Sequence, residues 1–194
     1  MRVIAGEAKG RQLKTPRKGL NTRPLTDRVR GALFNILSAK AVESEFLDLF
    51  AGTGAVGIEA LSRGANRAVF VELNRSAVDL IRENLELTGF SRQAEVFHAD
   101  VIRAIGILAG KRERFDLIYI GAPYDSPLLA KVMEKLSESE LMKPDGILIA
   151  EHRKQHQLDR VYGKIELYRE ASYGETVLNF YRKKNENSGL PGKL

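Results

Sequence analysis

Apolar and polar positions alternate along the chain in a way that predicts strands and helices in turn. Short apolar runs bounded by glycine or polar residues indicate strands over residues 46–50, 68–72, 94–98, 115–120 and 146–151. Apolar residues spaced three or four apart predict helices over residues 58–62, 75–88, 101–109 and 127–138. Repeated strand–helix units predict an α/β fold in which helices cover both faces of a mainly parallel sheet.

Both ends of the chain add elements to this repeat. Two alternating pieces around Gly6 and Gly10 predict a β-hairpin or a small extension at the N-terminus, not a helix. A helix capped near Thr26 precedes the first strand, because one face carries Val29, Leu33, Ile36 and Leu37. Residues 167–172 and 175–182 predict an antiparallel pair of strands close to the C-terminus.

The composition is typical of a globular protein from a reducing compartment. Of 194 residues, 43% are hydrophobic, 29% are charged and none is cysteine. The lack of cysteine excludes disulfides and thiolate metal sites. No apolar run approaches the roughly 20 residues of a membrane span, and the first residues lack the apolar core of a signal peptide. We therefore expect a cytoplasmic protein with no membrane partner.

Positive charge is concentrated at the N-terminus. The net charge is +6, yet residues 1–30 hold nine basic and two acidic side chains, a local balance of +7, and the rest of the chain sums to −1. Such an excess predicts a partner with a phosphate backbone. The alternative is a solvated arm that only aids solubility.

A glycine-rich turn after the first strand predicts a nucleotide-binding loop. Gly52, Gly54 and Gly57 fit G-x-G-x-x-G, although glycines after a strand can also serve only as a tight turn. Glu72 ends the next strand about 20 residues later, where a carboxylate can accept ribose hydroxyl groups. The charge of Asp48 would repel a pyrophosphate but attract a cationic ligand. We therefore expect S-adenosylmethionine, not NAD, as the cofactor.

A third carboxylate, Asp100, follows the strand over residues 94–98. Ligands of open α/β sheets bind beyond the carboxyl ends of the strands. We expect Asp100 and the backbone of Val101 to receive the adenine amino group. A lone acidic residue at a strand end is usually only solvated, but three of them beside one glycine loop indicate a shared site.

Longer motifs resemble those of the RsmD-type bacterial methyltransferases. They are residues 2–11 (RVIAGEAKGR), 22–28 (TRPLTDR), 32–36 (ALFNI), 48–64 (DLFAGTGAVGIEALSRG) and 173–176 (YGET). The resemblance covers nearly the whole chain. It implies a class I methyltransferase fold, Rossmann-like, with a seven-stranded, mostly parallel sheet and a small N-terminal β-extension. It also implies methyl transfer from S-adenosylmethionine to the exocyclic N2 amine of one guanine in 16S ribosomal RNA.

The resemblance also implies how the chain is divided and what it binds. Residues 1–25 would form the basic extension that contacts RNA, residues 26–183 the methyltransferase domain and residues 184–194 a flexible tail. We expect a monomer that binds 16S ribosomal RNA or the assembling small ribosomal subunit.

Three sets of site residues follow from the motifs and the resemblance. Cofactor binding is expected at Arg23, Asp48, Phe50, Gly52, Thr53, Gly54, Glu72, Leu73, Asp100 and Val101. RNA binding is expected at Arg2, Lys9, Arg11, Lys14, Arg17, Lys18 and Arg28. Catalysis is expected at Gly121, Ala122, Pro123 and Tyr124.

The catalytic set departs from the family pattern, which has Asp-Pro-Pro-Tyr or Asn-Pro-Pro-Tyr after the fourth strand. A side-chain oxygen at the first position would hold the amine and orient its lone pair toward the methyl carbon, while the aromatic ring would stack on an extruded base. Gly121 provides no such oxygen, although Asp125 is near enough in sequence to replace it. Three accounts stay open: an active variant, a weak or inactive RNA-binding homologue, and an enzyme with another target, such as an amine in DNA.

Four further side chains are expected to play no part in catalysis or metal binding. His152 and His156 lie four apart with no third ligand, so we expect no metal site. His98 is expected to be a packing residue, and Tyr119 to lie in the core.

Overall fold

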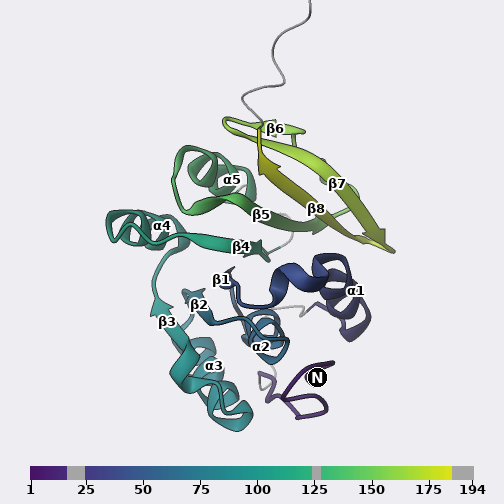
Figure 1. Cartoon of the computed structure of the whole chain (residues 1–194), viewed down its shortest axis with the longest axis vertical. Coiled ribbons are helices and arrows are strands. Elements are labelled where there is room, and N and C mark those ends of the chain that lie inside the picture. The colour runs from purple at the N-terminus through teal and green to yellow at the C-terminus, as the bar shows by residue number, and fades with distance from the viewer. Residues whose placement is uncertain (17–24, 124–127, 185–194) are drawn as a thin grey trace, which may run out of the picture.

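Eight strands form one sheet within residues 1–16, 25–123 and 128–184, which are the residues that the computed structural model describes. Their order across the sheet is β3-β2-β1-β4-β5-β8-β7-β6 (Figure 1). The strands are β1 (Glu45–Leu49), β2 (Arg67–Glu72), β3 (Ala94–His98), β4 (Phe115–Ile120), β5 (Met142–Arg153), β6 (Val161–Tyr162), β7 (Ile165–Tyr173) and β8 (Thr176–Lys183). The first five run parallel, and β8, β7 and β6 add an antiparallel edge. All seven strands predicted for the sheet are present, and β6 is an additional edge strand of two residues.

Five α-helices cover the two faces of the sheet in the described part of the chain. They are α1 (Asp27–Leu37), α2 (Ala55–Ser62), α3 (Arg75–Thr88), α4 (Val101–Gly110) and α5 (Leu128–Glu138). Helices α1, α2 and α3 pack on one face, and α4 and α5 on the other (Figure 1). Because the central strands bury both faces, they read in the sequence as continuous apolar runs. None of the described helices combines the length and the apolar character that crossing a membrane requires.

The helix ends follow from local hydrogen bonds that the sequence encodes. Thr26 caps α1 by accepting the amide of Val29 (3.3 Å). Asn74 caps α3 through the amides of Ser76 and Ala77. Helix α3 ends at Gly89, whose φ of 85° lies in the left-handed region. These signals act within a few residues, so the predicted bounds of α3 agree with the structure.

The order of the strands places a crevice between β1 and β4. From β1 the chain moves outward through β2 and β3, and then returns to β4 on the opposite side of β1. The loops that follow β1 and β4 therefore leave in opposite directions at the carboxyl edge of the sheet. Open α/β sheets bind ligands at this reversal, so the fold itself locates the candidate site.

The N-terminal segment, residues 1–16, packs against α2 (Figure 1). It turns back on itself with a single bridge between Arg2 and Gln12, not the ladder of a full hairpin. Gly6 lies so close to α2, with φ of +82°, that an added Cβ would be 1.6 Å from the carbonyl oxygen of Ser62. The division of the chain into three parts stays a prediction, and residues 185–194 of the expected tail lie outside the described residues.

Candidate functional site

The glycine loop connects β1 to α2 at the carboxyl edge of the sheet. Gly54 is the N-terminal cap residue of α2, with φ of 76°. Gly57 lies against the ring of Phe70, where an added Cβ would be 2.3 Å from Cε1. Phe50, before the loop, also has a positive φ of 65°. Close packing and turn geometry therefore account for the loop, which brings backbone amides to the crevice.

Glu72 ties the end of β2 to this loop. Its Oε2 accepts the amide of Gly52 (2.8 Å) and its Oε1 accepts the amide of Asn74 (2.8 Å). Each carboxylate oxygen has a second lone pair, so the carboxylate can still accept ligand hydroxyl groups. The neighbouring Leu73 is 65% exposed, which leaves an apolar surface beside the loop. The predicted ligand contacts of Glu72 and Leu73 stay predictions.

The structure corrects the prediction for His98, which is exposed and is not a packing residue. Its Nε2 shares a hydrogen bond with the carbonyl oxygen of Leu73 (2.9 Å). The imidazole therefore fixes the chain just after Glu72. The sequence pattern missed this role because the partner lies on the neighbouring strand end.

Asp100 is the N-terminal cap of α4. Its Oδ1 accepts the amides of Ile102 (2.9 Å) and Arg103 (3.2 Å). This contact orients the carboxylate at the end of β3, beside the end of β2 that carries Glu72. A structural role is thus shown, and the predicted contact of Asp100 and Val101 with adenine stays a prediction.

Asp48 is buried beneath the glycine loop, with 1% of its surface exposed. Its Oδ2 accepts the amide of Gly57 (3.0 Å), whereas Oδ1 has no hydrogen-bond partner among the described residues. Burial raises the pKa of Asp48 to about 8; the Gly57 amide opposes this shift, and the negative charges of Glu72 and Glu151 add to it. A cation placed nearby would favour the ionised carboxylate, so the site is suited to a cationic ligand.

The other side of the crevice begins where β4 ends. The backbone of Gly121 follows β4 and donates its amide to the carbonyl oxygen of Leu49 (3.2 Å). Ala122 and Pro123 line a cavity of about 160 Å³. The cavity is also lined by Leu129, Ala130, Glu151, His152, Arg153, His156, Gln157 and Leu158.

Tyr119 and Glu151 form a buried pair beside this cavity that the sequence pattern did not predict. The Tyr119 hydroxyl donates to Oε2 of Glu151. Their exposed fractions are 3% and 7%. Tyr119 lies in the core as predicted, and its polar end is directed at a carboxylate. Tyr124 and Asp125, also considered for this side of the site, lie outside the described residues.

His152 and His156 both line the cavity at the end of β4. His152 is 5% exposed near the end of β5, and its Nδ1 shares a hydrogen bond with the carbonyl oxygen of Arg153 (2.8 Å). Among residues 1–16, 25–123 and 128–184, no group of three or more His, Cys, Asp or Glu side chains could hold a metal ion.

The predicted RNA-binding residues that the structure describes are all exposed. Among them, Arg11 donates Nη1 to the carbonyl oxygen of Leu87 (2.7 Å), and Lys14 forms an ion pair with Glu83 (3.0 Å). Arg17 and Lys18, together with the expected cofactor contact Arg23, lie outside the described residues. Arg2, Lys9 and Arg28 are exposed as well, so positive charge is available on the N-terminal segment and on α1.

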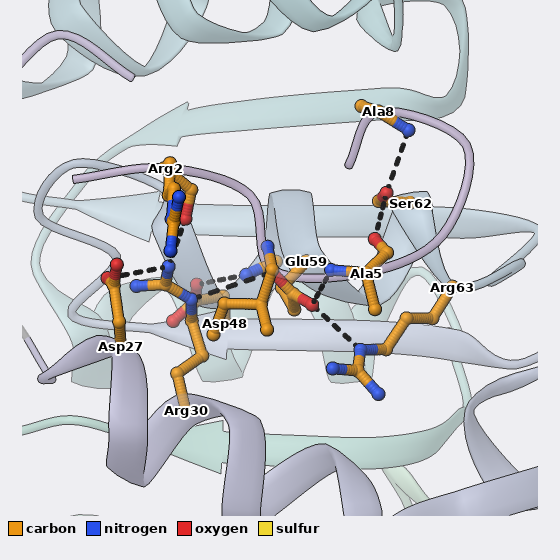
Figure 2. A network of polar contacts seen from close by, with 11 residues as sticks. Arg2, Ala5, Ala8, Asp27, Arg30, Asp48, Glu59, Ser62 and Arg63 are labelled. Carbon is orange, nitrogen blue, oxygen red and sulfur yellow. Dashed lines mark hydrogen bonds and ion pairs between the residues drawn. The ribbon is translucent and has the colours of Figure 1, made fainter. Parts of the chain in front are cut away.

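Arg30 differs from the other described basic residues of the N-terminus, because it is fully buried and its charge is not available to a partner. Its Nη2 contacts Oδ1 of Asp27 (3.1 Å) and the carbonyl oxygen of Arg2, and its Nε lies 3.6 Å from Oε2 of Glu59 (Figure 2). One of the nine basic residues at the N-terminus is therefore part of the core. The pattern of charge along the sequence did not distinguish it from its exposed neighbours.

Glu59 connects α2 to the N-terminal segment. Its two carboxylate oxygens accept the amides of Ile4 (2.8 Å) and Ala5 (3.1 Å) and the Nε of Arg63 (2.7 Å) (Figure 2). The sequence contained a signal for this role, since Glu59 is the single charged residue of helix α2. Such a carboxylate needs buried partners.

Two further polar side chains complete the attachment of the N-terminal segment. Ser62 accepts the amide of Ala8 (3.0 Å) and donates to the carbonyl oxygen of Ala5 (2.6 Å) (Figure 2). Asn84, buried on α3, accepts the amide of Lys14 (2.8 Å) and donates to the carbonyl oxygen of Thr53 (2.9 Å). The basic segment and the glycine loop thus share supporting residues.

The sequence matches a protein family and named relatives over most of its length. The model of a family described as Conserved hypothetical protein 95 matches residues 1–182. The chain is 32% identical to Ribosomal RNA small subunit methyltransferase D of Escherichia coli strain K12, over 94% of this chain and 90% of that protein. The protein of the same name from Haemophilus influenzae is 34% identical over 81% of each chain.

A solved structure shows that the similarity extends to the fold. The hypothetical protein TTHA0928 of Thermus thermophilus superimposes with a TM-score of 0.82 at 34% identity. The match covers 94% of this chain and 99% of that one.

Proposed function

Because the chain belongs to the Conserved hypothetical protein 95 family, the RsmD-type methyltransferases, we propose that it methylates the exocyclic N2 amine of a guanine in 16S ribosomal RNA, with S-adenosylmethionine as donor. The fold is that of a class I methyltransferase, with the strand order and the reversal between β1 and β4 described above. The observation that carries the proposal is the buried Asp48 beneath a glycine loop, next to Glu72. This arrangement favours a cationic cofactor without phosphate.

The residues at the strand ends fit the parts of this donor. The amides of the glycine loop and the carboxylate of Asp48 suit its amino-acid end, which carries a carboxylate and an ammonium group. Glu72 accepts the ribose hydroxyls, Leu73 packs against the adenine ring, and Asp100 with Val101 receives the adenine amino group. When bound, the donor supplies an activated methyl group on a sulfonium. The protein then has to position an amine in line with the carbon–sulfur bond.

Recognition of RNA rests on the basic N-terminal segment in this proposal. Lys9 and Arg11 are exposed and lie on a segment fixed to α2 and α3 by Glu59, Ser62 and Asn84. The charges are therefore held at a defined place relative to the glycine loop. A phosphate backbone bound there would bring a neighbouring base toward the crevice. We propose 16S ribosomal RNA, alone or in the assembling small subunit, as this partner, and a monomer as the active form.

Transfer of labelled methyl from S-adenosylmethionine tests the proposed activity. We expect label on small ribosomal subunits that lack the modification, at the N2 position of one guanine. The same subunits carrying the modification should accept none, which is the matched control. Label on duplex DNA but not on RNA would assign the activity to DNA. Donor binding without transfer to subunits or naked RNA would indicate a homologue that only binds RNA.

Binding to RNA should weaken steeply as salt rises, because contacts between lysine or arginine and phosphate release counterions. We expect Lys9→Gln to reduce the slope of log K against log salt concentration by about 1. Lys164→Gln is the control, because Lys164 is exposed and lies between β6 and β7 in the sequence. In Figure 1, β6 lies at the opposite end of the molecule from the N-terminus. Filter binding or fluorescence anisotropy between about 50 and 200 mM salt measures the slope. A flat response of the native chain would contradict the electrostatic role of the segment.

A further inference from the structure

A buried carboxylate, Glu151, lines the cavity at the end of β4. Asp48, Tyr119 and Glu151 stand at the carboxyl ends of β1, β4 and β5, which are neighbours in the sheet. The register pairs Asp48 with Tyr119 and Ile120 with Ala150. Extended by one residue, it places Gly121 opposite Glu151.

Gly121 leaves room for this arrangement. A Cβ added at Gly121 would lie 3.0 Å from Cε1 of Tyr119 and 3.5 Å from its hydroxyl oxygen. The tyrosine ring therefore lies beside the glycine and carries its hydroxyl to Glu151. The space next to Gly121 thus holds the hydroxyl end of Tyr119, from the same strand, and this hydroxyl orients the carboxylate of Glu151 on β5.

The distances between strands suit a transfer from one side of the crevice to the other. Neighbouring strands lie about 4.8 Å apart, so β1 and β5, which flank β4, are separated by about 10 Å. Asp48 lies beneath the glycine loop, and Glu151 lines the cavity at the end of β4. A donor methyl and an acceptor amine can meet between them.

We propose that Glu151, oriented by Tyr119, is the catalytic residue that binds the exocyclic amine of the target base and so replaces a side-chain oxygen at position 121. This inference rests on the proposed methyl transfer and adds to it. The carboxylate accepts an amine hydrogen, which fixes the nitrogen and directs its lone pair at the methyl carbon. It also stabilises the positive charge that develops on nitrogen.

The step balances without any further reactant. A bond forms between the amine nitrogen and the methyl carbon while the carbon–sulfur bond breaks, and its electron pair stays on sulfur. The nitrogen then loses a proton to Glu151, which passes it to water. The products are the methylated amine, a neutral thioether and a proton.

Glu151→Gln tests the inference, because glutamine keeps the size of the side chain but not its charge. We expect kcat to fall by about 10-fold to 100-fold, because the amide oxygen of glutamine accepts only an uncharged hydrogen bond and cannot take up the proton. The dissociation constant of S-adenosylhomocysteine, the KM for RNA and the thermal unfolding midpoint should stay close to the native values. Tyr119→Phe, which removes only the orienting hydroxyl, should lower kcat less. Glu138→Gln, the same exchange at an exposed end of α5, should change none of these.

Restoring a carboxylate at the end of β4 provides the decisive readout. In the Glu151→Gln background, Gly121→Asp should recover kcat at least about fivefold, because it returns the lost charge and its Cβ, 3.0 Å from Cε1 of Tyr119, needs only a small shift of the ring. A structural role of Glu151 would not produce this recovery. If Glu151→Gln keeps more than half of the native kcat, or if the double variant recovers nothing, Glu151 does not bind the amine. A native chain that transfers no methyl to any RNA would overturn the proposed function as well.

Discussion

Glu59→Ala is expected to lower the free energy of unfolding by about 3–5 kcal/mol, because it removes the buried carboxylate beside Arg30 and leaves that buried charge with only the half-exposed Asp27 among its described carboxylate partners. Both side chains are 0% exposed. The substitution also removes the acceptor for the amides of Ile4 and Ala5. A buried charge and partly buried amides that lose their partners are each costly. Urea unfolding followed by far-ultraviolet circular dichroism measures the change.

Two comparisons isolate the cause of this loss. Glu59→Ala combined with Arg30→Met removes both charges, and the double variant should be more stable than Glu59→Ala alone. Glu86→Ala, an exposed carboxylate on α3, should change the free energy of unfolding by less than about 0.5 kcal/mol. If the double variant is less stable than the single one, Arg30 has sufficient other partners and the ion pair with Glu59 is not what stabilises it.

Glu59→Ala should also affect ligand binding, since Glu59 fixes the N-terminal segment to α2. Helix α2 follows its cap residue Gly54 in the glycine loop and carries Glu59 and Ser62 on the side that faces residues 4–8. Asn84 adds a link from Lys14 to the carbonyl oxygen of Thr53. The segment proposed to bind RNA and the loop proposed to bind the donor are therefore built on common supports. Detachment of the segment would therefore lower the affinity for both RNA and the methyl donor.

Elements that depend on local signals could be predicted from the sequence alone. The caps Thr26 and Asn74 and the stop at Gly89 act within a few residues, so α1 and α3 were predicted closely. β5 begins earlier than predicted, at Met142, because pairing with Phe115 outweighs Pro144 and Gly146, which indicate a turn. A strand as short as β6 has no periodicity to detect.

Partners that lie far apart in the sequence could not be predicted. The pairs Arg30–Glu59 and Tyr119–Glu151 each join different elements, and no spacing in the sequence indicates them. The prediction placed Asp48 and Glu72 at the ends of neighbouring strands, which the structure confirms. It could not foresee that Glu72 binds the glycine loop through Gly52. The chemical role of single residues could thus be predicted from the sequence, whereas their contacts could be seen only in the folded structure.

The free energy of unfolding of the ligand-free protein should contain a contribution from Asp48 that falls as pH rises from about 4 to about 8. The Asp48→Asn variant should lack this pH-dependent contribution. The ordinary pKa of the carboxyl is 3.8, and burial raises it to about 8 in the folded chain. Below about pH 4 the carboxyl of Asp48 is protonated in both the folded and the unfolded chain, so its contribution to the free energy of unfolding has its full value. Between the two values the unfolded chain releases the proton and the folded chain keeps it, which costs up to about 1.4 kcal/mol per pH unit.

The measurable quantity is the difference in free energy of unfolding between the native chain and the Asp48→Asn variant. From pH 5 to pH 7 it should shift in favour of the variant by up to about 3 kcal/mol. Other titrating groups are common to both proteins and cancel. A cationic donor favours the ionised carboxylate, so its affinity for the native chain should rise over the same interval, with less effect in the variant. A difference in stability that stays constant from pH 5 to pH 8 would contradict this prediction. It would show that Asp48 is already ionised in the ligand-free fold.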